Sequence, residues 1–238
     1  MRGTQEPGGL ILIVEDNRNI SEMVGEYLEG RGFEVDYAAD GLDGYRLASE
    51  NTYDVIVLDL MLPRLDGIEG INLQRGQEPD AQVAFIDTIM VNLVGVWNTV
   101  HAIAPLMVER DQGGSIVLIS STNGLTGRGG DGSGAVTGYT ASKHGVVGIM
   151  RSLMIWLAPH GIRINTIHPA GVPTAMVAHE EMQAWFAGNP AGHTMGNAMP
   201  VAMLDPIDIS RAVLYLVEES GRHITGITLP VDAGFTGK

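Results

Sequence analysis

Two side chains that can exchange a proton lie four residues apart, at Tyr139 and Lys143, in a stretch whose apolar spacing predicts a helix over residues 139–157. A spacing of four residues places both side chains on one face of a helix. Because a nearby ammonium stabilises a phenolate, such a pair is suited to general acid–base chemistry. The same pair also arises by chance on helix surfaces, so it gains meaning only if other polar groups join it.

Three carboxylates follow two predicted strands in the first quarter of the chain. Glu15 and Asp16 come directly after a buried strand at 10–14, and Asp59 ends a second one at 54–59. The carboxyl ends of adjacent parallel strands converge, and a divalent cation such as Mg²⁺ would relieve the repulsion among these groups. The alternative is a solvated acidic rim that holds no ion tightly.

The apolar pattern predicts six strands separated by helices. The strands are expected at 10–14, 33–37, 54–59, 115–120, 163–167 and 227–231, and the helices at 20–28, 42–49, 80–109, 139–157 and 207–218. Pro105 is expected to kink the long helix, and a glycine-rich loop is expected over 124–138. This alternation predicts an α/β protein with one doubly wound parallel sheet. Two separate domains are the weaker alternative, because the first would hold only three strands.

Composition argues against several classes of partner and compartment. Twenty-eight acidic and 14 basic residues give a net charge of −14, which disfavours binding to nucleic acid or to a membrane surface, both polyanionic. The absence of cysteine excludes a disulfide framework and a thiolate site. The apolar runs fall short of the roughly 20 residues of a membrane span, and residues 1–7 lack the apolar core of a signal peptide. We therefore expect a cytoplasmic protein.

Residues 10–70 resemble the first half of a response-regulator receiver domain. The resemblance is carried by Ile13-Val-Glu-Asp16, Asp40-Gly41, Asp54-Val-Ile-Val-Leu-Asp59-Leu-Met-Leu-Pro63 and Asp66-Gly67. It implies that Glu15 and Asp16 help to bind Mg²⁺, with Asp59 close by, and that Asp59 accepts a phosphoryl group.

The second half of a receiver domain has no direct counterpart here. In that family a hydroxyl residue ends the fourth strand and Lys-Pro ends the fifth. By position, Ser120 or Ser121 replaces the hydroxyl residue, and His168-Pro169 replaces Lys-Pro. A mostly neutral imidazole lacks the permanent charge of lysine, so we expect phosphoryl transfer to Asp59 to be weak at most.

Residues 80–238 resemble the second half of a short-chain dehydrogenase/reductase, most closely the carveol-dehydrogenase-like group. The resemblance is carried by Val91-Asn92-Leu93, Gly114-Ser-Ile-Val-Leu-Ile-Ser-Ser121, Tyr139-Thr-Ala-Ser-Lys143, Arg163-Ile-Asn-Thr-Ile-His-Pro-Ala-Gly171 and Ile224-Thr-Gly-Ile-Thr-Leu-Pro-Val-Asp232. It implies that Tyr139 is the general acid–base, that Lys143 assists it and holds the nicotinamide ribose, and that Ser121 orients a carbonyl. Asn92 would complete a proton relay.

Binding of NAD(P) is where the second resemblance is incomplete. The family's glycine-rich turn after the first strand lets a pyrophosphate approach a helix N-terminus, but residues 15–19 read Glu-Asp-Asn-Arg-Asn. Each close pair of a carboxylate and a phosphate costs on the order of 4 kcal/mol at an effective dielectric constant of about 20, so affinity should fall roughly a thousandfold. Thr174 remains as a possible contact to the nicotinamide amide. We expect NAD(P) binding to be weak or lost.

The two resemblances combine into one sheet if the third receiver strand takes the place of the dehydrogenase's fourth. The expected fold is a flavodoxin-like/Rossmann hybrid with strand order 2-1-3-4-5-6. One composite domain (1–238) would comprise a receiver-like segment (10–70), a seam (71–79) and a dehydrogenase-like segment (80–238). We interpret the chain as an engineered chimera with vestigial sites from both families. The alternatives are a residual NAD(P)-dependent alcohol/ketone oxidoreductase and a weak Mg²⁺-dependent phospho-acceptor. The two long helices that carry Asn92 and Tyr139 would form a homo-oligomer interface, as the second resemblance implies.

Overall fold

The computed structural model describes residues 9–15, 18–58, 81–173 and 196–237. Its strands are β1 (Leu10–Val14), β2 (Glu34–Ala38), β3 (Val55–Leu58), β4 (Gly114–Ile119), β5 (Ile162–Pro169) and β6 (Thr228–Val231). They form one parallel sheet in the order β2-β1-β3-β4-β5-β6, which confirms the predicted order and the single-sheet fold.

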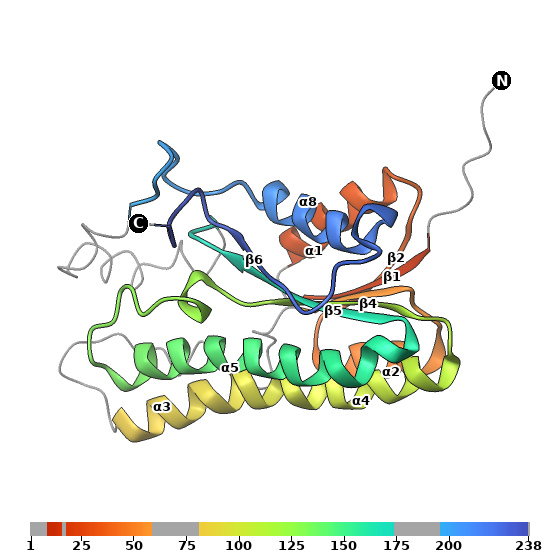
Figure 1. Cartoon of the computed structure of the whole chain (residues 1–238), viewed down its shortest axis with the longest axis horizontal. Helices are drawn as coiled ribbons and strands as arrows, with labels where there is room; N and C mark the ends of the chain where they lie inside the picture. Colours follow the sequence, from red (N-terminus) through yellow and green to blue (C-terminus); the bar gives the residue numbers. More distant parts are fainter. Residues whose placement is uncertain (1–8, 16–17, 59–80, 174–195, 238) are drawn as a thin grey trace.

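Helices cover both faces of the sheet (Figure 1). One layer contains α1 (Arg18–Glu29) and α8 (Pro206–Val217), and the other contains α2 (Gly41–Glu50), α4 (Val96–Arg110) and α5 (Gly134–Leu157). The helix α3 (Ala81–Ile89) runs along the outer side of α5, and the six-residue π-turn η1 (Met90–Gly95) joins α3 to α4. Short helical turns are η2 (Thr122–Gly124), η3 (Ala158–His160) and η5 (Glu219–Gly221).

Side chains alternate between two apolar cores along each central strand. In β1, Leu12 and Val14 belong to the core beneath α2, α4 and α5, whereas Ile11 and Ile13 belong to the core beneath α1 and α8. All four are almost fully buried. This alternation follows from the two-residue period of a strand, and it explains why β1 reads as a continuous apolar run.

The pairing of β3 with β4 joins the two segments that resemble different families. Val55 pairs with Ser115, and the parallel register continues to Leu58 and Leu118. Ile56, Ile116 and Leu118 lie in one core, and Val55, Val57 and Val117 lie in the other. Both cores are therefore built from side chains of both segments.

The predicted helix over 80–109 is interrupted by the π-turn. Pro105 lies inside α4, which continues to Arg110 and ends on Asp111 in the left-handed region at φ 51°. By length and composition alone, residues 81–110 would suffice to cross a membrane. One side of α4, including Val96, Val100 and Ala104, is buried in the core of the sheet.

The expectation that α5 begins at Tyr139 is wrong, because the helix begins at Gly134. Ser133 caps it by accepting a hydrogen bond at Oγ from the backbone N–H of Val136 at 3.2 Å. The glycines that suggested a loop allow close helix packing instead. A Cβ added at Gly138 would lie 2.9 Å from the carbonyl oxygen of Phe85, and one at Gly134 would collide with that of Ala81. Glycine therefore brings α3 against α5.

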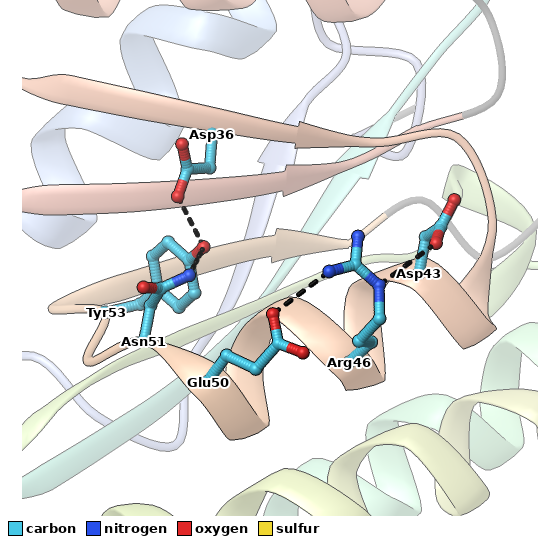
Figure 2. A network of polar contacts seen from close by, with 6 residues as sticks. All are labelled: Asp36, Asp43, Arg46, Glu50, Asn51 and Tyr53. Carbon is cyan, nitrogen blue, oxygen red and sulfur yellow. Dashed lines mark hydrogen bonds and ion pairs between the residues drawn. The ribbon is translucent and has the colours of Figure 1, made fainter.

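A polar network ties the connection between α2 and β3 to β2 (Figure 2). The Tyr53 hydroxyl donates to Asp36 Oδ2 at 2.5 Å and accepts from Asn51 Nδ2 at 3.3 Å. Burial, followed by this hydrogen bond to Asp36, raises the pKa of Tyr53 to about 12. The Tyr53 phenol therefore remains a hydrogen-bond donor throughout the neutral pH range. On the exposed face of α2, Arg46 contacts Glu50 at 3.0 Å and Asp43 at 3.5 Å.

Candidate active site

The predicted catalytic side chains come from the carboxyl end of β4 and from the two helices beside it. Ser121 follows β4, Tyr139 and Lys143 lie on α5, and Asn92 lies on the π-turn η1. The carboxyl ends of parallel strands are where open α/β sheets form their sites. Tyr139 and Lys143 adjoin each other, and the residues on either side of Ser121 contact the same turn of α5.

The side chains of Tyr139 and Lys143 adjoin each other, as their spacing predicts. Lys143 Nζ lies 5.5 Å from the centroid of the Tyr139 ring. Lys143 is only 3% exposed, and its ammonium forms no hydrogen bond or ion pair with any residue that the structure describes. A buried ammonium without an acidic partner is costly. This lysine is therefore suited to bind oxygen atoms of a ligand.

Backbone and side-chain contacts fix Ser121 at the end of β4. Its backbone is extended, with φ −160° and ψ 163°. Its carbonyl oxygen accepts hydrogen bonds from the Gly124 N–H at 2.8 Å and from His168 Nδ1 at 2.7 Å. Its Oγ accepts from the Asn123 N–H at 3.2 Å. No described residue accepts the proton of the Ser121 hydroxyl, which leaves it available to donate to a ligand oxygen.

The loop that contains Ser121 packs on the turn of α5 that carries Tyr139 and Lys143. Ser120 Oγ donates to the carbonyl oxygen of Lys143 at 3.1 Å. Asn123 Nδ2 donates to Thr140 Oγ1 at 3.2 Å. A Cβ at Gly124 would lie 2.8 Å from the same Lys143 carbonyl oxygen, so only glycine permits this approach. These contacts hold residues 120–124 against the turn of α5 that carries Tyr139 and Lys143.

Asn92 occupies the π-turn and is 2% exposed. Its Oδ1 is buried without a hydrogen-bond partner among the described residues. A buried acceptor without a donor is unfavourable, and π-turns within helices often occur at functional sites. The η1 turn packs on α5, where the side chain of Leu93 covers Gly145. The role of Asn92 in a proton relay stays a prediction.

Three predicted site residues, Asp16, Asp59 and Thr174, lie outside the described residues. Glu15 is described: its backbone N–H donates to the carbonyl oxygen of Ala38 at 3.0 Å. Only three residues, 15–17, separate β1 from α1, and none of them is glycine. Within the described part of the chain, no three acidic or histidine side chains are grouped to hold a metal ion. The magnesium site and the phospho-acceptor stay predictions.

The sequence suggests His168 only as a replacement for a receiver lysine, but the structure gives it a different environment. The side chain is fully buried at the end of β5. Burial lowers the pKa of its imidazole. Both ring nitrogens have partners, Ser121 O and Thr166 Oγ1. A neutral, enclosed ring cannot serve as the exposed cation of a receiver site. The one sequence signal for its position was a polar residue within an apolar strand.

Comparison with known proteins places most of the chain in one family. Residues 76–236, more than half of the chain, match the family model described as enoyl-(acyl carrier protein) reductase. The chain belongs to the short-chain dehydrogenase/reductase family. Residues 11–92 match the model of the response regulator receiver domain, which overlaps the first match at residues 76–92.

Curated relatives match the dehydrogenase part. An uncharacterized oxidoreductase of Mycobacterium tuberculosis is 51% identical over 154 residues, which cover 64% of this chain and 56% of the relative. The (−)-trans-carveol dehydrogenase of Rhodococcus erythropolis is 43% identical over 159 residues, which cover 63% and 56%. The chain thus spans just over half the length of these two short-chain dehydrogenase relatives.

Solved structures match the whole fold. A carveol dehydrogenase from Mycobacterium avium in complex with NAD has a TM-score of 0.74 and 28% identity, covering 98% of this chain and 99% of that one. A short-chain dehydrogenase from Mycobacterium paratuberculosis bound to NAD has a TM-score of 0.75 and 25% identity, with the same coverage. The six-stranded sheet is therefore of Rossmann type.

Proposed function

We propose that this chain is a composite α/β scaffold that keeps the proton-transfer end of a short-chain dehydrogenase site but binds NAD(P) poorly. Its chemistry would be a residual NAD(P)-dependent interconversion of an alcohol and a ketone. The observation that carries this proposal is the contrast between the Ser121–Tyr139–Lys143 group and the three-residue, glycine-free connection after β1.

The catalytic end supports oxidoreductase chemistry. Tyr139 would exchange a proton with the substrate oxygen, and the Ser121 hydroxyl would donate a hydrogen bond to the same oxygen. The buried Lys143 ammonium lies near the Tyr139 ring, where it would stabilise a phenolate. When bound, NAD(P) would supply or accept the hydride. Lys143 would hold its ribose hydroxyls, with Asn92 beside η1 as a proton-relay residue.

The part of the site that would hold the pyrophosphate fits a dinucleotide less well than the catalytic part does. A pyrophosphate needs backbone N–H groups exposed by a glycine-rich turn at a helix N-terminus. Here the first residue after β1 is Glu15, and its N–H already donates to the Ala38 carbonyl oxygen. Its carboxylate, together with that of Asp16 next in sequence, would repel phosphate. We therefore expect NAD(P) affinity to be weak and turnover to be slow.

Titration with NADH, followed by its fluorescence, tests the proposal. We expect a Kd of about 1 mM or weaker for the unmodified chain. The double substitution Glu15→Gln and Asp16→Asn should tighten binding at least tenfold, because it removes two charges near the phosphates. Glu26→Gln, a charge removal on the exposed surface of α1, is the matched control and should change little. Micromolar binding by the unmodified chain would contradict the proposed defect.

The same proposal includes the origin of the chain from two families. Residues 10–70 would be the receiver-like segment, 71–79 the seam and 80–238 the dehydrogenase-like segment of an engineered chimera with vestigial sites. The support is the pair of family matches, at 11–92 and 76–236.

A cytoplasmic location stays a prediction. Phosphorylation of Asp59 with Mg²⁺ also stays a prediction, and the enclosure of His168 in the place of the receiver lysine disfavours it.

We further propose a homo-oligomer through the helices that carry Asn92 and Tyr139. Large apolar side chains are exposed on them: Val83, Ile86, Met90, Trp97, Ile155 and Trp156. Exposure of so many large apolar side chains on these helices favours an interface. Sedimentation equilibrium should reveal a dimer that Trp97→Glu weakens at least tenfold. Tyr215→Glu, on α8 across the sheet, should leave it intact. A monomer at every concentration would overturn this interface.

A further inference from the structure

The imidazole of His168 bridges the ends of β4 and β5. Its Nδ1 lies 2.7 Å from the carbonyl oxygen of Ser121, and its Nε2 lies 2.8 Å from Thr166 Oγ1. The ring is fully buried, as is Thr166. No other side chain of the described residues bonds to the Ser121 carbonyl.

Hydrogen-bond chemistry selects one form of this ring. A carbonyl oxygen only accepts, so Nδ1 must carry a proton. In a neutral ring Nε2 is then an acceptor. The single proton of the Thr166 hydroxyl goes to this nitrogen at 2.8 Å, which is nearer than the Ile227 carbonyl oxygen at 3.4 Å. Burial lowers the pKa of His168, and Lys143 and His144 on α5 act in the same direction. The hydrogen bond to Ser121 acts in the opposite direction. The neutral tautomer with a proton on Nδ1 satisfies both partners.

This ring contacts the peptide group between Ser121 and Thr122. The Ser121 carbonyl oxygen accepts from two donors, the Gly124 N–H and His168 Nδ1. The Gly124 bond is local and belongs to the η2 turn, so it moves with the loop. Among the described residues, only the His168 bond ties this peptide group to the neighbouring strand β5. One residue earlier in the chain, the Ser120 N–H donates to the Ile167 carbonyl oxygen at 2.7 Å. This bond fixes the end of β4 against β5 but does not fix the Ser121 side chain.

We propose that His168 is a positioning residue for Ser121, acting as a neutral imidazole that donates from Nδ1. In this role it would not touch the substrate; it holds the carbonyl of Ser121 and so fixes the backbone that carries the hydroxyl. This inference rests on the proposed oxidoreductase function. Its structural part, the Nδ1–H bond to Ser121, can be tested without turnover.

Two substitutions test the roles of the two ring nitrogens separately. The amide N–H of Asn occupies nearly the same place as Nδ1–H, whereas the amide of Gln reaches the place of Nε2. His168→Asn should therefore keep the bond to Ser121 O, and His168→Gln should lose it while still reaching Thr166. Thermal melting of both variants establishes that each is folded before comparison.

The first readout is nitrogen-15 NMR of the folded chain. We expect the His168 signals, assigned by their loss in the variants, to show a protonated Nδ1 and an unprotonated Nε2. The amide signals of Ser121 and Thr122 should shift in His168→Gln and stay near their original positions in His168→Asn. A proton on Nε2 alone, or equal amide shifts in the two variants, would overturn the inference.

The second readout is single-turnover oxidation of a secondary alcohol at saturating NAD. We expect His168→Gln to lower the rate about tenfold or more, with the KM for alcohol little changed, because a small displacement of an orienting group is costly in rate. His168→Asn should restore the rate to within about threefold of the original. Equal rates in both variants would reject the positioning role. If the unmodified chain shows no turnover, the proposed function fails, and the NMR result alone decides the His168–Ser121 bond.

Discussion

Replacing Tyr139 by Phe is expected to lower the single-turnover rate of alcohol oxidation at least a hundredfold. Positioned general acid–base groups contribute about 10²–10⁴-fold to rate, and this substitution removes only the hydroxyl that would transfer the proton. The ring itself remains, so its contact with Lys143, whose Nζ lies 5.5 Å from the ring centroid, is kept. Absorbance of the reduced nicotinamide provides the measurement.

A matched control for this experiment is Tyr215→Phe, the same change on the exposed surface of α8. Neither substitution should alter the melting temperature by more than a few degrees, because no described residue bonds to the Tyr139 hydroxyl. If Tyr139→Phe retained a rate within threefold of the original, the observed turnover would not come from this site. The NADH affinity of Tyr139→Phe should also be unchanged, which separates a chemical defect from a binding defect.

Gly138→Ala and Gly148→Ala should change stability in opposite directions, although they are the same substitution on the same helix. A Cβ at Gly138 would lie 2.9 Å from the carbonyl oxygen of Phe85 and 3.2 Å from its Cα, both backbone atoms of α3. Overpacking of this kind costs about 1–3 kcal/mol. A Cβ at Gly148 would meet nothing within 4 Å, so the higher helix propensity of Ala should add about 0.5–1 kcal/mol.

Urea denaturation of Gly138→Ala and Gly148→Ala under the same conditions measures their free energies of unfolding. The Gly138 variant should also lose turnover, because α3 leads directly into the π-turn that carries Asn92, and a displaced α3 would shift that turn relative to Lys143. Stabilisation by both substitutions would mean that α3 and α5 are not held in close contact. In that event the arrangement of Asn92 beside the Tyr–Lys helix would need revision.

The first and third strands were predictable because β1 and β3 are apolar on both faces. Val55, Ile56 and Val57 all read as core, and the structure buries all three. A parallel sheet with helices on both sides is the arrangement that buries such runs. The position of β3 beside β4 follows once the two resemblances are combined. The fold was therefore fixed by local patterns and by the requirement for right-handed crossovers.

Three features of the site could not be predicted from side-chain patterns. The π-turn at 90–95 is a change in backbone hydrogen bonding, and the apolar spacing of Val91 and Val96 does not reveal it. Glycines at 134 and 138 read as loop residues because glycine weakens an isolated helix. Their actual role depends on α3, a partner distant in sequence. His168 was missed for the same reason, since its bond to Ser121 spans 47 residues.

The β3–β4 pairing also bears on how the chain folds. Before these strands meet, the first segment ends its sheet at the unpaired edge of β3, and the second begins its sheet at the unpaired edge of β4. Open strand edges pair readily with other chains, and parallel pairing between distant segments forms slowly. Every molecule must therefore close its own sheet before a neighbour does so. We therefore expect the yield of folded protein to rise with dilution during refolding, because the edges of β3 and β4 must pair within one chain.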